Sequence, residues 1–373
     1  MSRMEMVDLH SQYLRMKEEV DSALMKVVEN GQFINGPEVH SFAQNLGAFL
    51  KSEYVVPCGN GTDALQLALM ALDLKPGDEV ITTTFSFVAT AEVIALLGLT
   101  PVFVDVEEGS YNISPSEVEA AITSRTKVIL PVHLFGQSAN MKEIMRIAQK
   151  HNLFVVEDVA QSLGATYEMD GTSKFLGTIG HIGCTSFFPS KNLGGFGDGG
   201  ACYTYDEALA GKIKMIASHG SAKRYYHDVV GVNSRLDTLQ AAVLDVKLKY
   251  LQSFLEARSW AGKLYNQLLG DVEGISIPKD EPYANHTYNQ YTIRVLNDRR
   301  DELQKYLQTQ NVPSRIYYPM PLHKQNAFEE TVDSKLKLPI SERLSLEVLS
   351  LPMHTEMTQA DVEKVANAIK SFL

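Results

Sequence analysis

The chain has 373 residues, of which 45% are hydrophobic and 21% are charged, and its formal net charge is −11. This composition is typical of a globular protein that is long enough for two domains. The acidic balance argues against general binding to nucleic acid or to an acidic membrane, because both require a basic footprint.

The cysteine count and the N-terminus add two expectations. The three cysteines form no C-x-x-C pair, which argues against a disulfide framework or a metal site and fits a reducing compartment. The first residues lack the apolar core of a signal peptide. The most apolar run, residues 87–104, is interrupted by a glutamate, a glycine and a proline, so we predict a buried helix, a turn and a buried strand there. We expect a cytoplasmic protein without a membrane span.

Short apolar runs rich in β-branched residues alternate with helical patterns through the first two thirds of the chain. The predicted strands are 54–58, 79–84, 101–106, 127–134, 153–159, 184–188 and 201–205. Several are apolar almost throughout, which is typical of strands covered on both faces. The stretches 62–72 and 141–152 have helical periodicity. This alternation predicts an α/β domain with a mainly parallel sheet.

The pattern changes after about residue 236. Residues 237–269 have long helical periodicity, which predicts one helix. Predicted elements then follow in the order strand, helix, strand and C-terminal helix, the first three at 287–296, 299–310 and 314–318. We therefore predict a large α/β domain over residues 1–240 and a smaller α+β domain over residues 241–373.

The stretch "CGNGTDAL" (58–65) places the end of a strand, two glycines and the start of a helix in succession. Thr62 or Asp63 could cap this helix, and the free amides of its first turn can hold a phosphate. A tight turn with an ordinary cap fits the same residues.

A second interpretation of this stretch is a dinucleotide site. Gly59, Gly61 and Ala64 match G-x-G-x-x-A, which would indicate a nicotinamide-dependent oxidoreductase. That fingerprint also needs an acidic residue at the end of the next strand, whereas Asp78 and Glu79 precede that strand. The ribose contact is therefore missing from the pattern.

Asp158 and Lys191 each follow a predicted strand, and ligands gather at the carboxyl ends of such strands. A carboxylate there needs a cation or strong donors, so Asp158 is either part of a structural ion pair or the partner of a protonated ring nitrogen, as in pyridoxal phosphate (PLP) enzymes. Lys191 is then the Schiff-base lysine rather than a surface lysine. Phe187 and Phe188 suggest apolar packing around it, and the glycines of 194–200 let backbone approach a cofactor closely.

Several motifs occur along almost the whole chain: "VDLHSQY", "GQFINGPEV", "GNGTDAL", "FSFVATA", "VEDVAQS", "SFFPSKNLGGFGDGGA", "GVNSRLDTLQAA" and "YYPMPLH". Together they resemble the DegT/DnrJ/EryC1/StrS sugar aminotransferases. These are fold-type-I PLP enzymes that aminate keto groups of nucleotide-linked sugars. The resemblance implies that this chain has the same fold, cofactor and reaction.

The resemblance also implies residue roles. Lys191 forms the Schiff base with PLP, and Asp158 faces the ring nitrogen. The other cofactor contacts that it implies are Gly61, Thr62 and Ser186 at the phosphate, Phe87 over the ring, Gln161 beside the ring hydroxyl and Asn233 from the neighbouring subunit. The last contact implies a homodimer with composite active sites. Some family members are dehydratases with histidine at the lysine position, and Lys191 argues against that branch.

The segment 219–237 gathers cations in an acidic chain, either as a solvated face or as a contact for a diphosphate. The expected substrate-binding residues are Lys223, Arg224, Arg235, Tyr318 and His323. Relatives often have histidine-tyrosine before the proline of "YYPMPLH", and Tyr317 replaces that histidine here.

The resemblance implies that glutamate donates the amino group and that Lys191 moves the proton. Among subfamilies, the motifs are most similar to enzymes that aminate C3 of UDP-2-acetamido-2-deoxy-3-oxo-glucuronate for surface polysaccharides. The alternatives are an aminase of a dTDP-3-oxo- or 4-oxo-6-deoxyhexose, the nicotinamide-dependent oxidoreductase, and a non-catalytic PLP-binding regulator.

Overall fold

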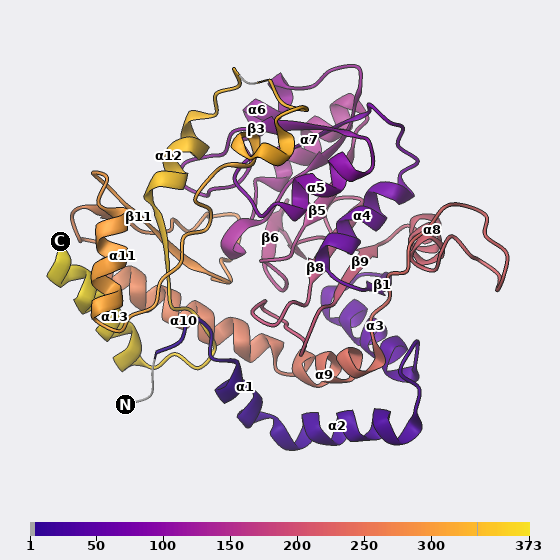
Figure 1. Cartoon of the computed structure of the whole chain (residues 1–373), viewed down its shortest axis with the longest axis horizontal. Helices are drawn as coiled ribbons and strands as arrows, with labels where there is room; N and C mark the ends of the chain where they lie inside the picture. Colours follow the sequence, from indigo (N-terminus) through magenta and orange to yellow (C-terminus); the bar gives the residue numbers. More distant parts are fainter. Residues whose placement is uncertain (1–3, 334) are drawn as a thin grey trace.

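A seven-stranded sheet forms the centre of the computed structural model, which describes residues 4–333 and 335–373 (Figure 1). In spatial order its strands are β1 (Tyr54–Cys58), β9 (Gly200–Thr204), β8 (Ile182–Ser186), β5 (Phe154–Asp158), β4 (Thr126–Leu130), β2 (Glu79–Thr83) and β3 (Thr100–Val104). β9 is antiparallel to both of its neighbours, and the other adjacent pairs are parallel. The predicted mainly parallel α/β sheet is confirmed.

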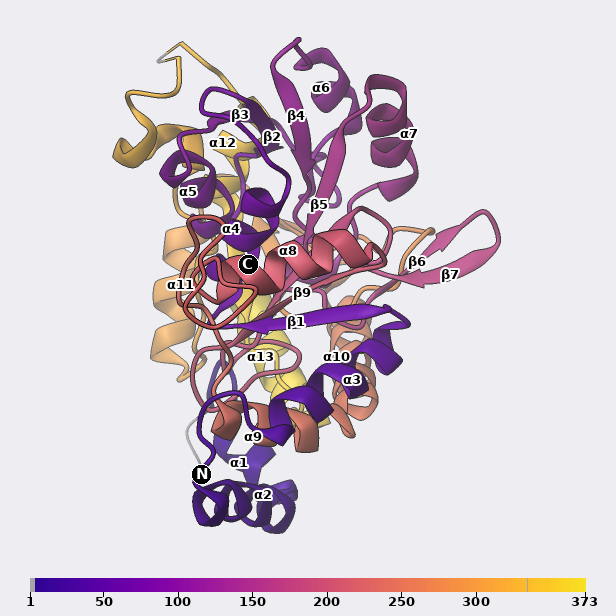
Figure 2. The ribbon, with the colours of Figure 1, turned by 90° about the vertical axis from the view of Figure 1, so that its right-hand side faces the viewer.

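Two layers of helices cover the sheet, as Figure 2 shows from the side. One layer contains α4 (Gly61–Ala71), α5 (Ala89–Leu96) and α8 (Glu207–Ala217), and the other contains α3 (Pro37–Leu50), α6 (Pro115–Ala120), α7 (Met141–His151) and α9 (Thr238–Leu248). Because side chains alternate along a strand, Val155 of β5 joins one apolar core and Val156 joins the other. This explains why the central strands are apolar almost throughout.

The C-terminal part contains a second, antiparallel sheet in the order β10-β11-β12. Its strands and the helices and turns around it are α10 (Leu251–Leu269), β10 (Ile275–Ser276), β11 (Tyr291–Val295), α11 (Arg300–Thr309), the 3-10 turns Leu322–Lys324 and Asn326–Phe328, α12 (Pro339–Glu347), β12 (Val348–Leu351) and α13 (Gln359–Phe372). The N-terminal helices α1 (Leu9–Arg15) and α2 (Lys17–Asn30) lie below the large sheet in Figure 1. Gln12 of α1 donates a buried hydrogen bond of 3.1 Å to Thr355, so the two ends of the chain lie together.

The prediction of one helix over 237–269 is wrong, because α9 and α10 are separated at Lys249 and Tyr250. The amides of these two residues bond to carbonyls three residues back, which tightens the chain at the junction. Both side chains also bond to Glu19 of α2. A contact with a distant helix, rather than a local glycine or proline, marks this junction, so the local pattern could not predict it.

The predicted strand at 314–318 is also absent. Arg315 pairs with Ser350 through two backbone hydrogen bonds of 3.0 and 2.7 Å, which is one isolated bridge beside β12. Pro319 follows shortly and cannot donate to a strand ladder. The chain then continues as irregular structure toward the large sheet.

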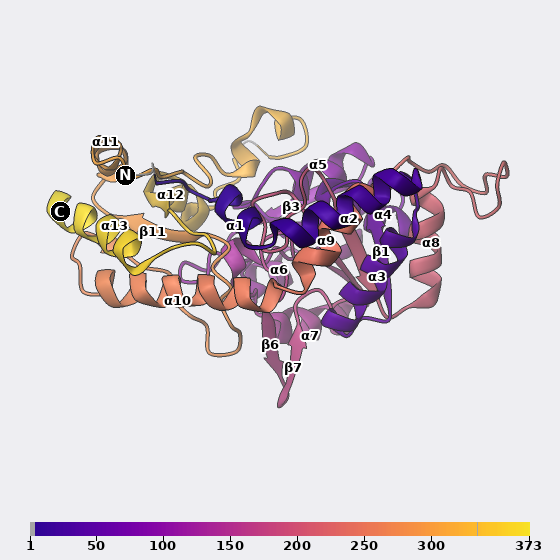
Figure 3. The ribbon, with the colours of Figure 1, turned by 90° about the horizontal axis from the view of Figure 1, so that it is seen from below.

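The hairpin of β6 (Thr166–Met169) and β7 (Thr172–Phe175) was not predicted. It projects from the body in Figure 2 and Figure 3, and most residues of β7 are exposed. Such a short, polar strand has too little apolar pattern to be recognised. Within residues 4–333 and 335–373, no helix is long and apolar enough to cross a membrane.

A core of the large sheet and the core of the small sheet meet along α10, which lies parallel to the long axis of the molecule in one half of Figure 3. Leu251 and Leu255 pack in a core of the large sheet, whereas Ala261, Tyr265 and Leu269 pack against the small sheet. The division into residues 1–240 and 241–373 stays a prediction, and the packing favours a boundary inside α10.

Arg258 of α10 fixes the small sheet to this helix. Its guanidinium is almost fully buried and donates to the carbonyl oxygens of Tyr288, Asn289 and Met353 at 3.4, 3.2 and 3.2 Å. Burial lowers the pKa of Arg258 to about 10. The carbonyl oxygens therefore compensate a desolvated cation at the place where the two cores meet.

We predict that Arg258→Met lowers the free energy of unfolding by about 3 kcal/mol, because the apolar stem still packs but three buried carbonyls lose a donor. Urea unfolding measures the loss. The control is Arg343→Met, which removes an exposed arginine of α12 whose partner Glu108 is also exposed, and it should cost less than about 0.5 kcal/mol. Equal stability of the two variants would contradict this account of α10.

Candidate active site

The carboxyl ends of three strands meet at one edge of the large sheet. Gly200, the first residue of β9, pairs with Cys58 at the end of β1 and with Ser186 at the end of β8. β5 lies on the other side of β8 and ends at Asp158. The register therefore brings Ser186, Asp158 and the start of α4 together, as the sequence predicts for a ligand site.

The start of α4 is built to hold an anion. Asn60, and not the predicted Thr62 or Asp63, is the N-cap, and its side chain accepts from the amide of Asp63 at 2.8 Å. Gly61 and Thr62 stand ahead of the first intrahelical bond, from Ala64 to Asn60, so their amides face outward at the positive end of the helix dipole. A Cβ on Gly61 would lie 2.6 Å from the Cβ of Ser186, so only glycine allows this approach.

Asp158 is buried, and both of its carboxylate oxygens accept hydrogen bonds. Oδ1 accepts from the amide of Ala160 at 3.1 Å, and Oδ2 accepts from the hydroxyl of Thr90 at 2.9 Å. Burial raises the pKa of Asp158, while these two bonds and the positive charge of Lys191 act in the opposite direction. The carboxylate is thus fixed in orientation at the sheet edge.

Lys191 follows β8 and lies close enough to Asp158 for the two charges to influence each other's pKa. The side chain is half-buried, but the dense packing of protein around its ammonium group lowers the pKa of Lys191. Phe187 packs in the core at 5.3 Å from Phe42, between ring centroids, whereas Phe188 is 51% exposed. Only one of the two predicted aromatic contacts therefore belongs to the apolar core.

Two of the glycines after Lys191 pack against a side chain of the protein itself, and the approach of this loop to a cofactor stays a prediction. The amide of Phe196 donates to Gln240 Oε1 at 2.8 Å. A Cβ on Gly195 or Gly197 would lie 2.7 or 2.9 Å from the amide group of Gln240. The glycine-rich loop therefore wraps around one side chain of α9.

Gln161, Tyr318 and Phe87 lie together beside Asp158. Gln161 accepts from the amide of Phe135 at 2.8 Å and donates to the hydroxyl of Tyr318 at 3.1 Å. Phe87 is 55% exposed, and its ring centroid lies 6.4 Å from that of Tyr318. The structure thus brings a predicted substrate residue next to two predicted cofactor residues.

His323 has internal partners for both ring nitrogens. Nδ1 lies 2.7 Å from the hydroxyl of Thr84, and Nε2 lies 3.3 Å from Glu342. Burial lowers the pKa of His323. These contacts favour a role in positioning the 317–323 segment, and the predicted substrate contact is left without support from the geometry.

Lys223 and Arg224 lie on the long connection between α8 and α9, which extends from the body at the right of Figure 1. Each cation lies 5.0 Å from the ring centroid of a neighbouring tyrosine, Tyr226 and Tyr225 respectively. Within the described residues, no hydrogen bond, ion pair or cation–π contact joins these cations to Asp158 or Lys191. The structure of one chain therefore does not assemble the whole predicted substrate site.

The same connection returns to the start of α4 through Ser234. The hydroxyl of Ser234 donates to Asp63 at 2.6 Å and accepts from the amide of Gly59 at 3.0 Å. Asn233 on one side is exposed, and Arg235 on the other is half-buried. Ser234 was missed from the sequence, where a serine between two notable residues gives no signal of its own.

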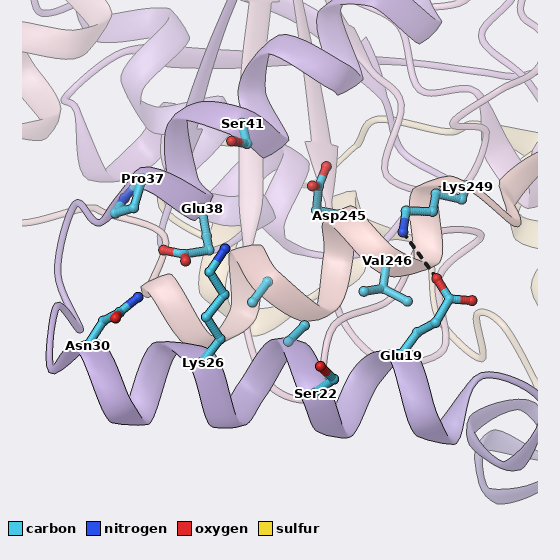
Figure 4. Close-up of a pocket in the computed structure, with 12 residues that line it drawn as sticks. Glu19, Ser22, Lys26, Asn30, Pro37, Glu38, Ser41, Asp245, Val246 and Lys249 are labelled. Carbon is cyan, nitrogen blue, oxygen red and sulfur yellow. Dashed lines mark hydrogen bonds and ion pairs between the residues drawn. The ribbon is translucent and has the colours of Figure 1, made fainter.

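The dinucleotide interpretation lacks its acidic partner in the structure. Glu79 begins β2, whereas Gly61 follows the end of β1, so the two residues lie at opposite edges of the parallel strands. Glu79 is buried and pairs with Arg125 at 2.6 Å. A hollow of about 430 Å³ lies between α2, α3 and α9, where Lys26, Glu38 and Asp245 line it (Figure 4). None of its lining residues is a predicted site residue, so it is separate from the site.

The chain matches the model of the DegT/DnrJ/EryC1/StrS aminotransferase family over residues 14–370. It is 45% identical to the UDP-2-acetamido-2-deoxy-3-oxo-D-glucuronate aminotransferase of Pseudomonas aeruginosa, over 98% of this chain and 99% of that protein. It is 43% identical to a pleiotropic regulatory protein of Geobacillus stearothermophilus, over 98% of each chain.

Two further similarities concern Streptomyces venezuelae. The dTDP-3-amino-3,4,6-trideoxy-alpha-D-glucose transaminase of this organism is 36% identical, over 99% of this chain and 96% of that protein. The crystal structure of DesV in complex with a ketimine intermediate superposes with a TM-score of 0.96 at 36% identity, covering 100% of this chain and 99% of that chain.

We predict that Gly200→Ala lowers the affinity for PLP by about tenfold or more, because the new Cβ would lie 2.3 Å from the carbonyl oxygen of Asn60 and displace the start of α4. Titration of the apoprotein with PLP measures this. The control is Gly211→Ala in α8, where a Cβ meets nothing within 4 Å. It should keep the wild-type affinity and stabilise the helix by about 0.5–1 kcal/mol. Wild-type affinity in Gly200→Ala would refute the predicted phosphate site.

Proposed function

The chain belongs to the DegT/DnrJ/EryC1/StrS aminotransferase family and is a PLP-dependent sugar aminotransferase, and we propose that it moves an amino group from glutamate to C3 of UDP-2-acetamido-2-deoxy-3-oxo-glucuronate. The observation that carries the proposal is the place of Lys191 after β8, near enough to Asp158 at the carboxyl edge of the large sheet for each charge to influence the pKa of the other. The product would enter a surface polysaccharide.

The residues at the sheet edge fit PLP. The outward amides of Gly61 and Thr62, with the hydroxyl of Ser186 beside them, form a cradle that a Cβ on Gly61 would fill, and this cradle suits a phosphate. Phe87 would cover one face of the ring and Gln161 would contact its hydroxyl. PLP, when bound, supplies an electron sink for the carbon that loses a proton.

Lys191 and Asp158 divide the acid–base work. Because packing lowers the pKa of Lys191, its neutral amine is available to take the proton from the α-carbon of the donor and to return a proton on the other side of the transferred nitrogen. Asp158 would hold the proton on the ring nitrogen, and its two fixed donors keep the carboxylate oriented for that contact.

The identity of the sugar rests on the closer similarity to the Pseudomonas enzyme, at 45%, than to the dTDP-sugar transaminase, at 36%. A glucuronate carries a carboxylate that a 6-deoxyhexose lacks, so the site needs a cation or several donors near C6. The candidates are Arg235, Tyr318 and the pair Lys223 and Arg224. Of these candidates Tyr318 has the most direct support, because its hydroxyl accepts from Gln161, a predicted cofactor residue.

A second candidate function is a PLP-binding regulator, which the name of the Geobacillus relative favours. Both candidates use the same cofactor residues, so binding of PLP does not separate them. Steady turnover of an amino sugar with 2-oxoglutarate does separate them, because a regulator needs binding alone.

We further propose a homodimer in which Asn233 and Arg235 serve the partner's site. The exposed position of Asn233 on a connection that leaves the body supports this arrangement. It also supplies a reason why Lys223 and Arg224 extend outward: they would contact an anionic group, the diphosphate or the C6 carboxylate, of a substrate held mainly by the other subunit.

We predict that inactive Lys191→Ala and inactive Arg235→Ala subunits regain activity when mixed, because one site of each mixed dimer keeps both residues. Random exchange should approach about a quarter of wild-type activity. The control mixes the double variant Lys191→Ala/Arg235→Ala with Arg235→Ala, which leaves no intact site. No recovery after verified subunit exchange would show that Arg235 acts within its own chain.

We predict that UDP-2-acetamido-3-amino-glucuronate reacts with 2-oxoglutarate with a higher kcat/KM than amino sugars without the carboxylate. The expected factor is about 10- to 100-fold for each protein donor that would contact the carboxylate. The panel contains UDP-linked and dTDP-linked 3-amino sugars and a 4-amino-6-deoxyhexose. Equal rates with a dTDP-3-amino-6-deoxyhexose would reject the substrate while leaving the aminotransferase activity in place.

A further inference from the structure

Among the described residues, Thr90 is the one side chain that donates a hydrogen bond to Asp158, and it was not predicted as a site residue. Its hydroxyl lies 2.9 Å from Asp158 Oδ2, and the side chain is 1% exposed. It lies on the first turn of α5, three residues after Phe87, and its amide donates to the carbonyl oxygen of Phe87 at 3.3 Å. One short segment therefore carries both the expected ring-stacking residue and a contact to the carboxylate.

Counting protons gives this contact a direction. A carboxylate only accepts, so the single hydroxyl proton of Thr90 is used on Asp158. The hydroxyl of Ser86 lies 3.1 Å from that of Thr90, so Ser86 must be the donor in this second bond. The result is a buried chain in which Ser86 donates to Thr90 and Thr90 donates to Asp158.

We propose that Thr90, oriented by Ser86, is a positioning residue that holds Asp158 charged and aimed at the ring nitrogen of PLP. This inference rests on the proposed role of Asp158. The amide of Ala160 fixes Oδ1 and Thr90 fixes Oδ2, so the carboxylate is held from two different elements and cannot rotate freely. Each hydroxyl in a chain polarises the next, which strengthens the bond at the carboxylate.

The titratable groups around Asp158 set the direction of the expected change. The charge of Lys191 favours the ionised carboxylate, as the hydroxyl of Thr90 does. His133 also lies near, but its Nδ1 accepts from the amide of Ala139 at 3.1 Å and so carries no proton. Cys184 of β8 and Tyr318 also face it, and burial, with a smaller contribution from the negative charge of Asp158, raises the pKa of both. Burial destabilises the ionised form of Asp158, and the Thr90 hydroxyl is one of the contacts that offset this effect. Without that hydroxyl the ionised form becomes less stable.

The test compares the wild type with Thr90→Val, which removes the hydroxyl and keeps the shape. The pH titration of the absorbance of the PLP-loaded protein is the first readout. Its midpoint should move to higher pH, because the lysine nitrogen keeps its proton longer when the ring nitrogen carries less positive charge. The value of kcat should fall about 10- to 100-fold, the worth of one hydrogen bond to a charged group, with a smaller change in KM.

Three matched variants separate positioning from general damage. Thr90→Ser keeps the hydroxyl and should restore the titration midpoint and most of kcat. Ser86→Ala leaves Thr90 in place and should shift the midpoint in the same direction by less, which also tests the chain if Thr90→Val does not fold. Thr82→Val removes an equally buried hydroxyl, which donates to the carbonyl oxygen of Leu130 at 2.8 Å and makes no bond to Asp158. This variant should change neither readout.

The proposal is overturned if Thr90→Val and Ser86→Ala keep the wild-type midpoint and kcat, or if Thr82→Val changes both as Thr90→Val does. Asp158→Asn distinguishes this failure from failure of the proposed function. An impaired Asp158→Asn with a normal Thr90→Val rejects only the hydroxyl chain. Full activity in Asp158→Asn rejects the role of Asp158 itself.

Discussion

The rest of the site depends on one constraint: the carboxylate of Asp158 and the amine of Lys191 lie near each other at a sheet edge that is largely shielded from solvent. Burial acts against both charges, since it raises the pKa of Asp158 and lowers that of Lys191. The fold limits this cost by ending β5 and β8 side by side, so that each charge helps the other. It also fixes the carboxylate with donors, while the lysine is left half-buried and able to move.

A low pKa alone does not select the lysine that we propose as the reactive one. Lys247 of α9 is more deeply buried than Lys191, and its pKa is also lowered, to about 8, mainly by burial. It lies 5.8 Å from the ring centroid of Phe196, on the helix that the glycine-rich loop wraps. What distinguishes Lys191 is its place after β8, facing Asp158 beside the start of α4. Strand order, more than amine chemistry, therefore defines the site.

The sequence predicted the parts of this protein that depend on local pattern. The apolar runs gave the strands of the large sheet, and β1 has the predicted bounds 54–58. Features that depend on distant partners were missed. Tyr250 at the helix junction bonds to Glu19, and the glycines at 195 and 197 pack against Gln240. Thr90 was missed for the same reason, because its meaning comes from Asp158, 68 residues away.

The central claim is that Lys191 is the residue that binds PLP, and borohydride reduction of the PLP-loaded protein tests it most directly. Reduction makes the link permanent, and digestion followed by mass spectrometry locates it. The account predicts the label on the peptide that contains Lys191 and no label in Lys191→Ala. A label on Lys247 or on any other lysine of the wild-type protein would contradict it.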